Sequence, residues 1–153
     1  MRCAIVLLAS VALAGCATPA SPGMAADAGW GFDQTPEEGA KLAYGVSETD
    51  NVALMLTCAP RSGRVTITAP IPDRHRGRRI DLASGPRRSR LAATLLPDEG
   101  LGPSLEAHTA LSDPVLRNFA DKGELLVDAG FGRMALPARD KAPVRRFVEA
   151  CGG

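Results

Sequence analysis

Apolar and polar side chains alternate along several short stretches of this sequence, a period of two that is typical of β-strands with one buried face. Clusters of Gly, Pro, Asp and Ser separate these stretches, as turns do. The pattern predicts strands at residues 41–46, 52–59, 64–69, 80–84, 89–96, 104–111, 124–127 and 131–136. We expect the ordered domain to begin at about Trp30.

The clearest strand is residues 52–59, whose alternate positions place Val52, Leu54, Leu56 and Cys58 on one face. Its other face is also largely apolar, which favours a strand inside a sheet rather than at its edge. Turn residues 60–63 lead from it into residues 64–69, and this pair is the strongest hairpin signal in the chain.

Two helices are predicted as well. The first begins after Asp113, an N-cap residue type followed by Pro114 at the first helical position, and Gly123 ends it. Its apolar stripe consists of Val115, Leu116 and Phe119. The second helix is expected at residues 140–151, with Pro143 tolerated in its first turn and Gly152 as its stop. Its buried face is expected to consist of Val144, Phe147, Val148 and Cys151.

Many short strands, one short helix and one C-terminal helix argue for a mainly β fold class. We expect an antiparallel sheet, sandwich-like or a half-barrel, with both helices packed on it.

The start of the chain has a different pattern. Arg2 supplies a positive charge and residues 4–12 are almost entirely apolar, which is the layout of a secretory signal. The run ends in Leu13-Ala14-Gly15-Cys16, which resembles the lipobox of bacterial lipoproteins. The resemblance implies that the Cys16 thiol is acylated and that the chain is cut just before it. The alternatives are a plain secretory signal and an uncut apolar anchor with a chance cysteine.

The predicted domain organisation is therefore a signal peptide at residues 1–15, a lipid-anchored tether at 16–29 and a single β-rich domain at 30–153. The resemblance implies attachment to a membrane through the lipid on Cys16, facing the periplasm. Ala17 in place of an aspartate favours the outer membrane, again by that resemblance. A chain cut before Cys16 would carry 17 basic and 17 acidic side chains, so no overall field favours nucleic acid as a partner.

Cleavage would discard Cys3 and lipid would occupy Cys16, which leaves Cys58 and Cys151. Two thiols in an oxidising compartment predict one disulfide, and both cysteines fall on predicted core faces. Two separate buried thiols are the alternative. A metal site at these cysteines is less favoured, because no histidine lies near either of them in the sequence.

Residues 61–90 hold nine arginines and only two acids. Guanidinium groups match phosphate and carboxylate groups bidentately, so this stretch is a candidate anion-binding segment. The candidate residues are Arg74, Arg76, Arg78, Arg79, Arg87, Arg88 and Arg90. The competing interpretation is an arginine-favouring composition, with surface arginines paired to nearby acids.

No motif predicts catalysis. The chain lacks a Gly-x-Ser-x-Gly turn, and the predicted domain lacks a Ser-x-x-Lys pair. His75 lies among arginines without a neighbour at ligand spacing, and His108 is expected on a polar strand face beside Glu106. We therefore expect no cofactor, no metal and no enzymatic activity.

The function that the sequence favours is a membrane-anchored, non-enzymatic binding module. Its partner would be another protein or an anionic component of the cell envelope. The alternatives are a periplasmic inhibitor or accessory subunit of an envelope complex, and a hydrolase assembled from distant segments. The β domain and its C-terminal helix also loosely resemble small uncharacterised periplasmic proteins of proteobacteria, a resemblance that implies no activity.

Overall fold

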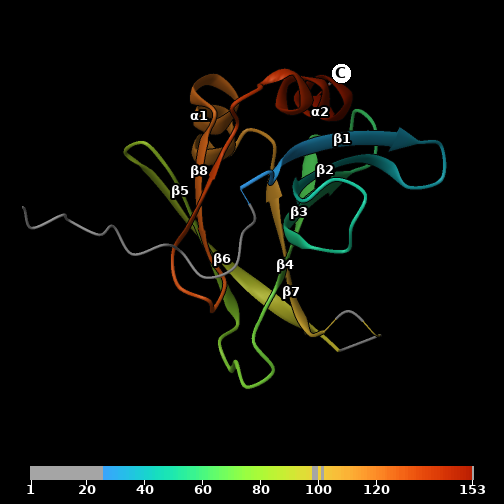
Figure 1. The fold of residues 1–153 in the computed structure, drawn as a ribbon. Helices are drawn as coiled ribbons and strands as arrows, with labels where there is room; N and C mark the ends of the chain where they lie inside the picture. Colours follow the sequence, from blue (N-terminus) through green and yellow to red (C-terminus); the bar gives the residue numbers. More distant parts are fainter. Residues whose placement is uncertain (1–25, 98–99, 101, 153) are drawn as a thin grey trace, which may run out of the picture.

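A computed structural model describes residues 26–97, 100 and 102–152. It is one antiparallel, nearly closed barrel-like sheet of nine strands with two helices at one end (Figure 1), which confirms the mainly β fold class. The strands are β1 Gly29–Thr35, β2 Gly39–Gly45, β3 Val52–Cys58, β4 Arg64–Pro70, β5 Arg79–Ser84, β6 Arg87–Leu96, β7 Ser104–Ala110, β8 Glu124–Asp128 and β9 Met134–Pro137. The helices are α1 Pro114–Lys122 and α2 Ala142–Gly152.

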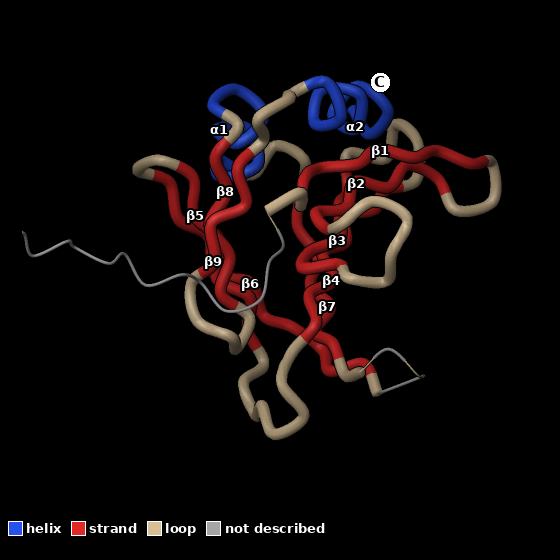
Figure 2. The backbone as a smooth tube through the Cα atoms, in the orientation of Figure 1, coloured by secondary structure: helices blue, strands red, loops and turns tan. Residues whose placement is uncertain are grey.

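The spatial order of the strands is β1-β2-β3-β4-β7-β6-β5-β8-β9. The predicted hairpin of β3 and β4 is present, and β3 lies inside the sheet, as its two apolar faces predict. The loop between β4 and β5 and the loop between β8 and β9 lie at the end of the molecule away from the helices (Figure 2). The sheet therefore has a helical end and a loop end.

Strand β1 is not among the strands that the sequence pattern predicts. It pairs with β2 along its full length, from Gly29 opposite Gly45 to Thr35 opposite Gly39. Its glycines and polar residues give little alternation, so its extended form depends on pairing with β2. The predicted signal and most of the predicted tether lie outside the described residues, while Gly29, assigned to the tether, belongs to β1.

The predicted strand at residues 131–136 is wrong at its start, because β9 begins only at Met134. Phe131 lies instead in the loop, with 47% of its surface exposed. Gly130 and Gly132 on either side have φ angles of 125° and 82°. These positive φ angles are incompatible with a strand, and glycine adopts them without steric cost.

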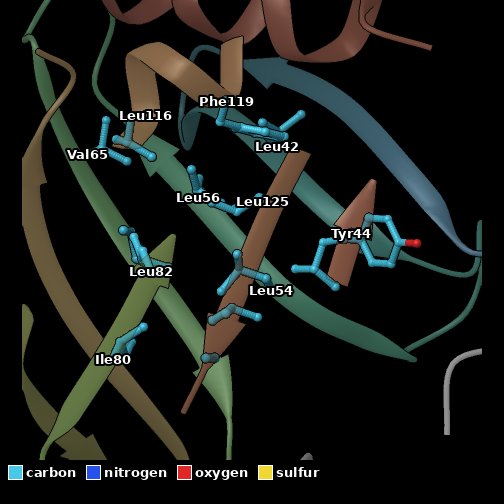
Figure 3. Close-up of a cluster of buried hydrophobic side chains, with 14 of the residues drawn as sticks. Leu42, Tyr44, Leu54, Leu56, Val65, Ile80, Leu82, Leu116, Phe119 and Leu125 are labelled. Carbon is cyan, nitrogen blue, oxygen red and sulfur yellow. The ribbon is translucent and has the colours of Figure 1, made fainter. Parts of the chain in front are cut away.

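The core fills the inside of the barrel. One cluster contains Leu42 of β2, Leu54 and Leu56 of β3, Leu82 of β5 and Leu125 of β8, and the side chains of α1 close it at the helical end (Figure 3). These residues occupy the inward positions of their strands, so alternation along each strand decides which face is buried.

Helix α1 begins and ends as predicted. Asp113 accepts a hydrogen bond from the backbone N–H of Val115 at 2.7 Å, Pro114 opens the helix, and Gly123 closes it in a left-handed conformation. The Asp113 carboxylate also accepts from the Ser89 hydroxyl at 2.8 and 2.9 Å, which holds the helix start against β6. At the other end, a hydrogen bond and the charge of Lys122 lower the pKa of the exposed Asp121.

Helix α2 packs against β1 and β2. It spans Ala142–Gly152 rather than residues 140–151, and Val144, Phe147 and Cys151 are buried as predicted, whereas Val148 is half-buried. Gly152 is the last helical residue and not a stop beyond the helix. The carbonyl groups at this end are satisfied from outside the helix, because the backbone N–H groups of Arg61 and Gly63 donate to Ala150 and Cys151, both at 2.9 Å.

The same end of α2 carries a disulfide. Cys151 is joined to Cys58 at the end of β3, with 5.9 Å between the Cα atoms, in the pairing that the sequence predicts. The bridge and the two backbone hydrogen bonds fix the C-terminal turn of α2 to the β3–β4 hairpin. Neither helix in the described ranges is long and apolar enough to cross a membrane.

A candidate binding groove on the outer face of strands β5, β8 and β9

One outward face of the sheet is built from three neighbouring strands. Ala83 of β5 lies opposite Leu126 of β8, and Leu126 lies opposite Ala135 of β9. Two residues further along β5 and β8, at the next position on the same face, Asp81 lies opposite Asp128. Since successive side chains alternate between faces, all these residues point away from the core that Leu82 and Val127 enter.

Three hollows adjoin one another along this face. The first, of about 380 Å³, is lined by Ala83, Leu126, Ala135 and Pro137 among others, and the second, of about 70 Å³, shares Ala83 and Leu126 with it. The third, of about 170 Å³, shares Asp81 with the second, and Asp128 as well. We call this row of hollows the β5–β8 groove.

The groove has an apolar end. Outward positions of an antiparallel sheet are usually polar, yet Ala83, Leu126, Ala135 and Pro137 follow one another here. Ala83 is almost fully buried and Leu126 is half-buried, while Ala135 and Pro137 are exposed. The small side chains on either side of Leu126 leave the space that forms the first hollow.

The middle of the groove holds two carboxylates. Like charges directly opposite each other destabilise a strand pair unless they are compensated. The charge of Asp81 is compensated, because its carboxylate forms ion pairs with the Nε of Arg79 at 2.9 Å and the Nε of Arg90 at 3.2 Å. Asp128 accepts the backbone N–H of Gly130 at 3.1 Å, and no described basic side chain forms an ion pair with it.

His75 forms the other end of the groove and connects two loops. Its ring lies between Gly77 on its own loop and Gly130 on the β8–β9 loop, so closely that a Cβ atom at either glycine would collide with the ring. Its Nε2 atom is buried and has no hydrogen-bond partner among the described residues. Burying such an atom without a partner costs free energy.

The structure divides the predicted arginine cluster. Arg79, Arg88 and Arg90 lie on the outward face of β5 and β6, and Arg78 and Arg79 line the third hollow. Arg87 lies opposite Ser84, on the other face of the hairpin. Arg74 and Arg76 are exposed in the β4–β5 loop and line none of the three hollows.

Two arginines, Arg88 and Arg133, line the second hollow of the groove. Arg88 lines the second hollow, and its Nη1 donates to the carbonyls of Gly85 at 2.6 Å and Arg87 at 2.7 Å, which orients its guanidinium. Arg133 lines the same hollow and was not among the predicted residues. Its approach to β5 depends on the pairing of β5 with β8, about 40 positions later, which no local pattern indicates.

His108, the second histidine, lies outside the groove, on the polar strand face beside Glu106 that the sequence predicts. His108 is exposed on β7, with its Nδ1 at 3.1 Å from the Thr66 hydroxyl and its Nε2 at 3.5 Å from Glu106. Among residues 26–97, 100 and 102–152, no three His, Cys, Asp or Glu side chains gather as metal ligands would. Cys16, the predicted lipidation site, lies outside the described residues.

No protein family, curated protein or solved structure matches this chain in the comparisons with each of them.

Proposed function

We propose that this protein is a lipid-anchored envelope protein whose β domain binds an anionic component of the envelope through the β5–β8 groove. The lipobox-like residues 13–16 support the anchor. The presence in the groove of arginines without acidic partners among the described residues supports an anionic ligand, and the proposal depends mainly on this observation.

The charge balance of the groove favours an anion. Asp81 is matched by Arg79 and Arg90, so the remaining charges at the second and third hollows are those of Arg78, Arg88 and Arg133 against Asp128. No described acid lies within ion-pair distance of these three arginines. Charge-assisted hydrogen bonds from guanidinium groups to phosphate or carboxylate are among the stronger ones in proteins.

The anchor is tested by labelling bacteria that express the full chain with a radioactive fatty acid. The unchanged chain is expected to take up label and to fractionate with membranes, whereas Cys16→Ser takes up none and leaves the membrane fraction. Continued labelling of the Cys16→Ser chain would exclude lipidation at this residue.

The ligand is tested with inorganic phosphate as the probe and backbone amide NMR shifts as the readout. Charge reversal by Arg88→Glu with Arg133→Glu is expected to weaken phosphate binding at least tenfold. The matched control is Arg117→Glu with Arg145→Glu, which reverses two exposed charges on the helices. Equal binding by both double variants would show that the groove arginines do not hold the anion.

A hydrolase is the second candidate function, because His75, Asp81 and Asp128 line one hollow. A histidine near carboxylates is the arrangement that general-base activation of water uses. The test is hydrolysis of small chromogenic esters and phosphodiesters, with His75→Gln as the variant. Turnover no faster in the unchanged protein than in the variant counts against hydrolysis at this site.

A further inference from the structure

The apolar end of the β5–β8 groove and its charged middle differ in chemistry, and this difference narrows the class of ligand. The inference rests on the proposed binding function of the groove. The first hollow is apolar and has a volume of about 380 Å³, within the roughly 300–1,000 Å³ that small-molecule sites occupy. An inorganic anion bound among the arginines would leave this hollow unused.

The distance between the apolar end and the charged middle follows from strand geometry. Leu126 at the apolar end and Asp128 in the middle of the groove are two residues apart on β8 and point to the same face. A strand rises about 3.4 Å per residue, so their positions are about 7 Å apart. A ligand that occupies both places therefore has its apolar part directly next to its anionic part.

The direction of the ligand follows from the charges. Glu124, an exposed acid, lines the apolar hollow and lies opposite Pro137 in the sheet, whereas Arg133 lines only the second hollow. An anionic group is repelled by Glu124 and attracted by Arg88 and Arg133. The anionic group thus lies at the second hollow, and the apolar part extends over Leu126 and Ala135.

We infer that the β5–β8 groove binds a single-chain amphiphile, with its phosphate or carboxylate head group at Arg88 and Arg133 and its hydrocarbon chain over Leu126. Binding removes the exposed apolar surface of Ala135 and Pro137 from water, and each methylene that becomes buried contributes about 0.8 kcal/mol. The head group supplies charge complementarity, and the chain supplies most of the affinity.

The test uses residues 16–153 with Cys16→Ser and four probes below their micelle-forming concentrations: dodecyl phosphate, dodecanoate, dodecyl maltoside and inorganic phosphate. The two charged amphiphiles are expected to bind at least tenfold more tightly than either the uncharged one or phosphate alone. Comparing dodecyl phosphate with dodecanoate shows which head group the site prefers. The shifted amide signals are expected on β5, β8 and β9.

Two variants separate the parts of the site. Leu126→Gln is expected to weaken binding of dodecyl phosphate about tenfold and to leave inorganic phosphate binding unchanged. Met55→Gln, a half-buried outward position on β3, is the matched control. Equal binding of dodecyl phosphate and phosphate, or equal effects of the two variants, would refute the inference that the groove binds an amphiphile. If phosphate binding still depends on Arg88 and Arg133 in that case, the proposed anion-binding function survives; if it does not, both fail.

Discussion

The indole N–H of Trp30 in β1 donates a hydrogen bond to the backbone carbonyl of Leu136 in β9, at 3.2 Å. These two strands are the first and the last in the spatial order of the sheet. A side chain thus connects the two edges where backbone pairing is missing. The indole also packs against Tyr44 at 5.2 Å and Phe119 at 5.0 Å between ring centroids, so one residue ties both edges to the core and to α1.

This relationship predicts a graded effect of substitution. Trp30→Phe keeps an aromatic ring but loses the donor, and we expect it to lower the free energy of unfolding by about 1–3 kcal/mol, since the Leu136 carbonyl loses its partner. Trp30→Ala also loses the packing and should cost about 3–5 kcal/mol. Urea unfolding measures both. An unchanged midpoint for Trp30→Phe would mean that the indole hydrogen bond does not stabilise the closure.

The Cys58–Cys151 disulfide closes a loop with a sequence separation of 93 residues. We expect the double variant Cys58→Ala with Cys151→Ala to unfold with a free energy about 2–5 kcal/mol lower. Each single variant should lose a similar amount, because either one removes the bridge. Mass analysis of the unreduced protein should give a mass two hydrogens below that of the reduced protein. Free alkylation of both cysteines in protein purified without a reducing agent would contradict the pairing.

We expect a substitution of Arg61 by glycine to stabilise the fold. Its φ angle is 57°, in the left-handed region, and its backbone N–H donates to the carbonyl of Ala150 at the end of α2. Arg61→Gly keeps this donor and relieves the steric cost, so we expect a gain of up to about 1 kcal/mol. The matched control is Arg64→Gly, an exposed strand position, where glycine should instead cost about 0.5–1 kcal/mol. Thermal unfolding that shifts in the same direction for both variants would refute this assignment.

The contact of His75 in the β4–β5 loop with the β8–β9 loop can be measured separately from backbone strain by comparing Gly130 with Gly132. Both have positive φ angles, but only at Gly130 would a Cβ atom collide with the His75 ring, whereas the space at Gly132 is open. Gly130→Ala should therefore destabilise the protein more than Gly132→Ala. The additional loss should be about 1–3 kcal/mol, the usual cost of forcing an extra group into a packed site. His75→Ala should remove this additional cost in a double-mutant cycle. Additive effects of the two substitutions would mean that His75 does not hold the loops together.

The sequence by itself determines much of the local structure. Alternation along 52–59 and 64–69 places β3, β4 and their hairpin, and Asp113, Pro114 and Gly123 place α1. These features depend on neighbours a few residues apart, such as a capping oxygen and the N–H two residues later. The disulfide could be predicted because each cysteine lies on the buried face of a recognisable element.

Only the tertiary structure decides how distant segments meet. The pairing of β5 with β8 places Asp81 opposite Asp128 and brings Arg133 to the predicted arginines, while it leaves Arg87 on the other face. Strand β1 has too little alternation to be read from its own residues, and it is extended because β2 supplies its hydrogen-bond partners. The start of β9 is set by two glycines whose backbone angles appear only in the fold. Local chemistry thus determines most of the elements, and the groove arises from strand order, which depends on burying all the inward faces in one barrel at once.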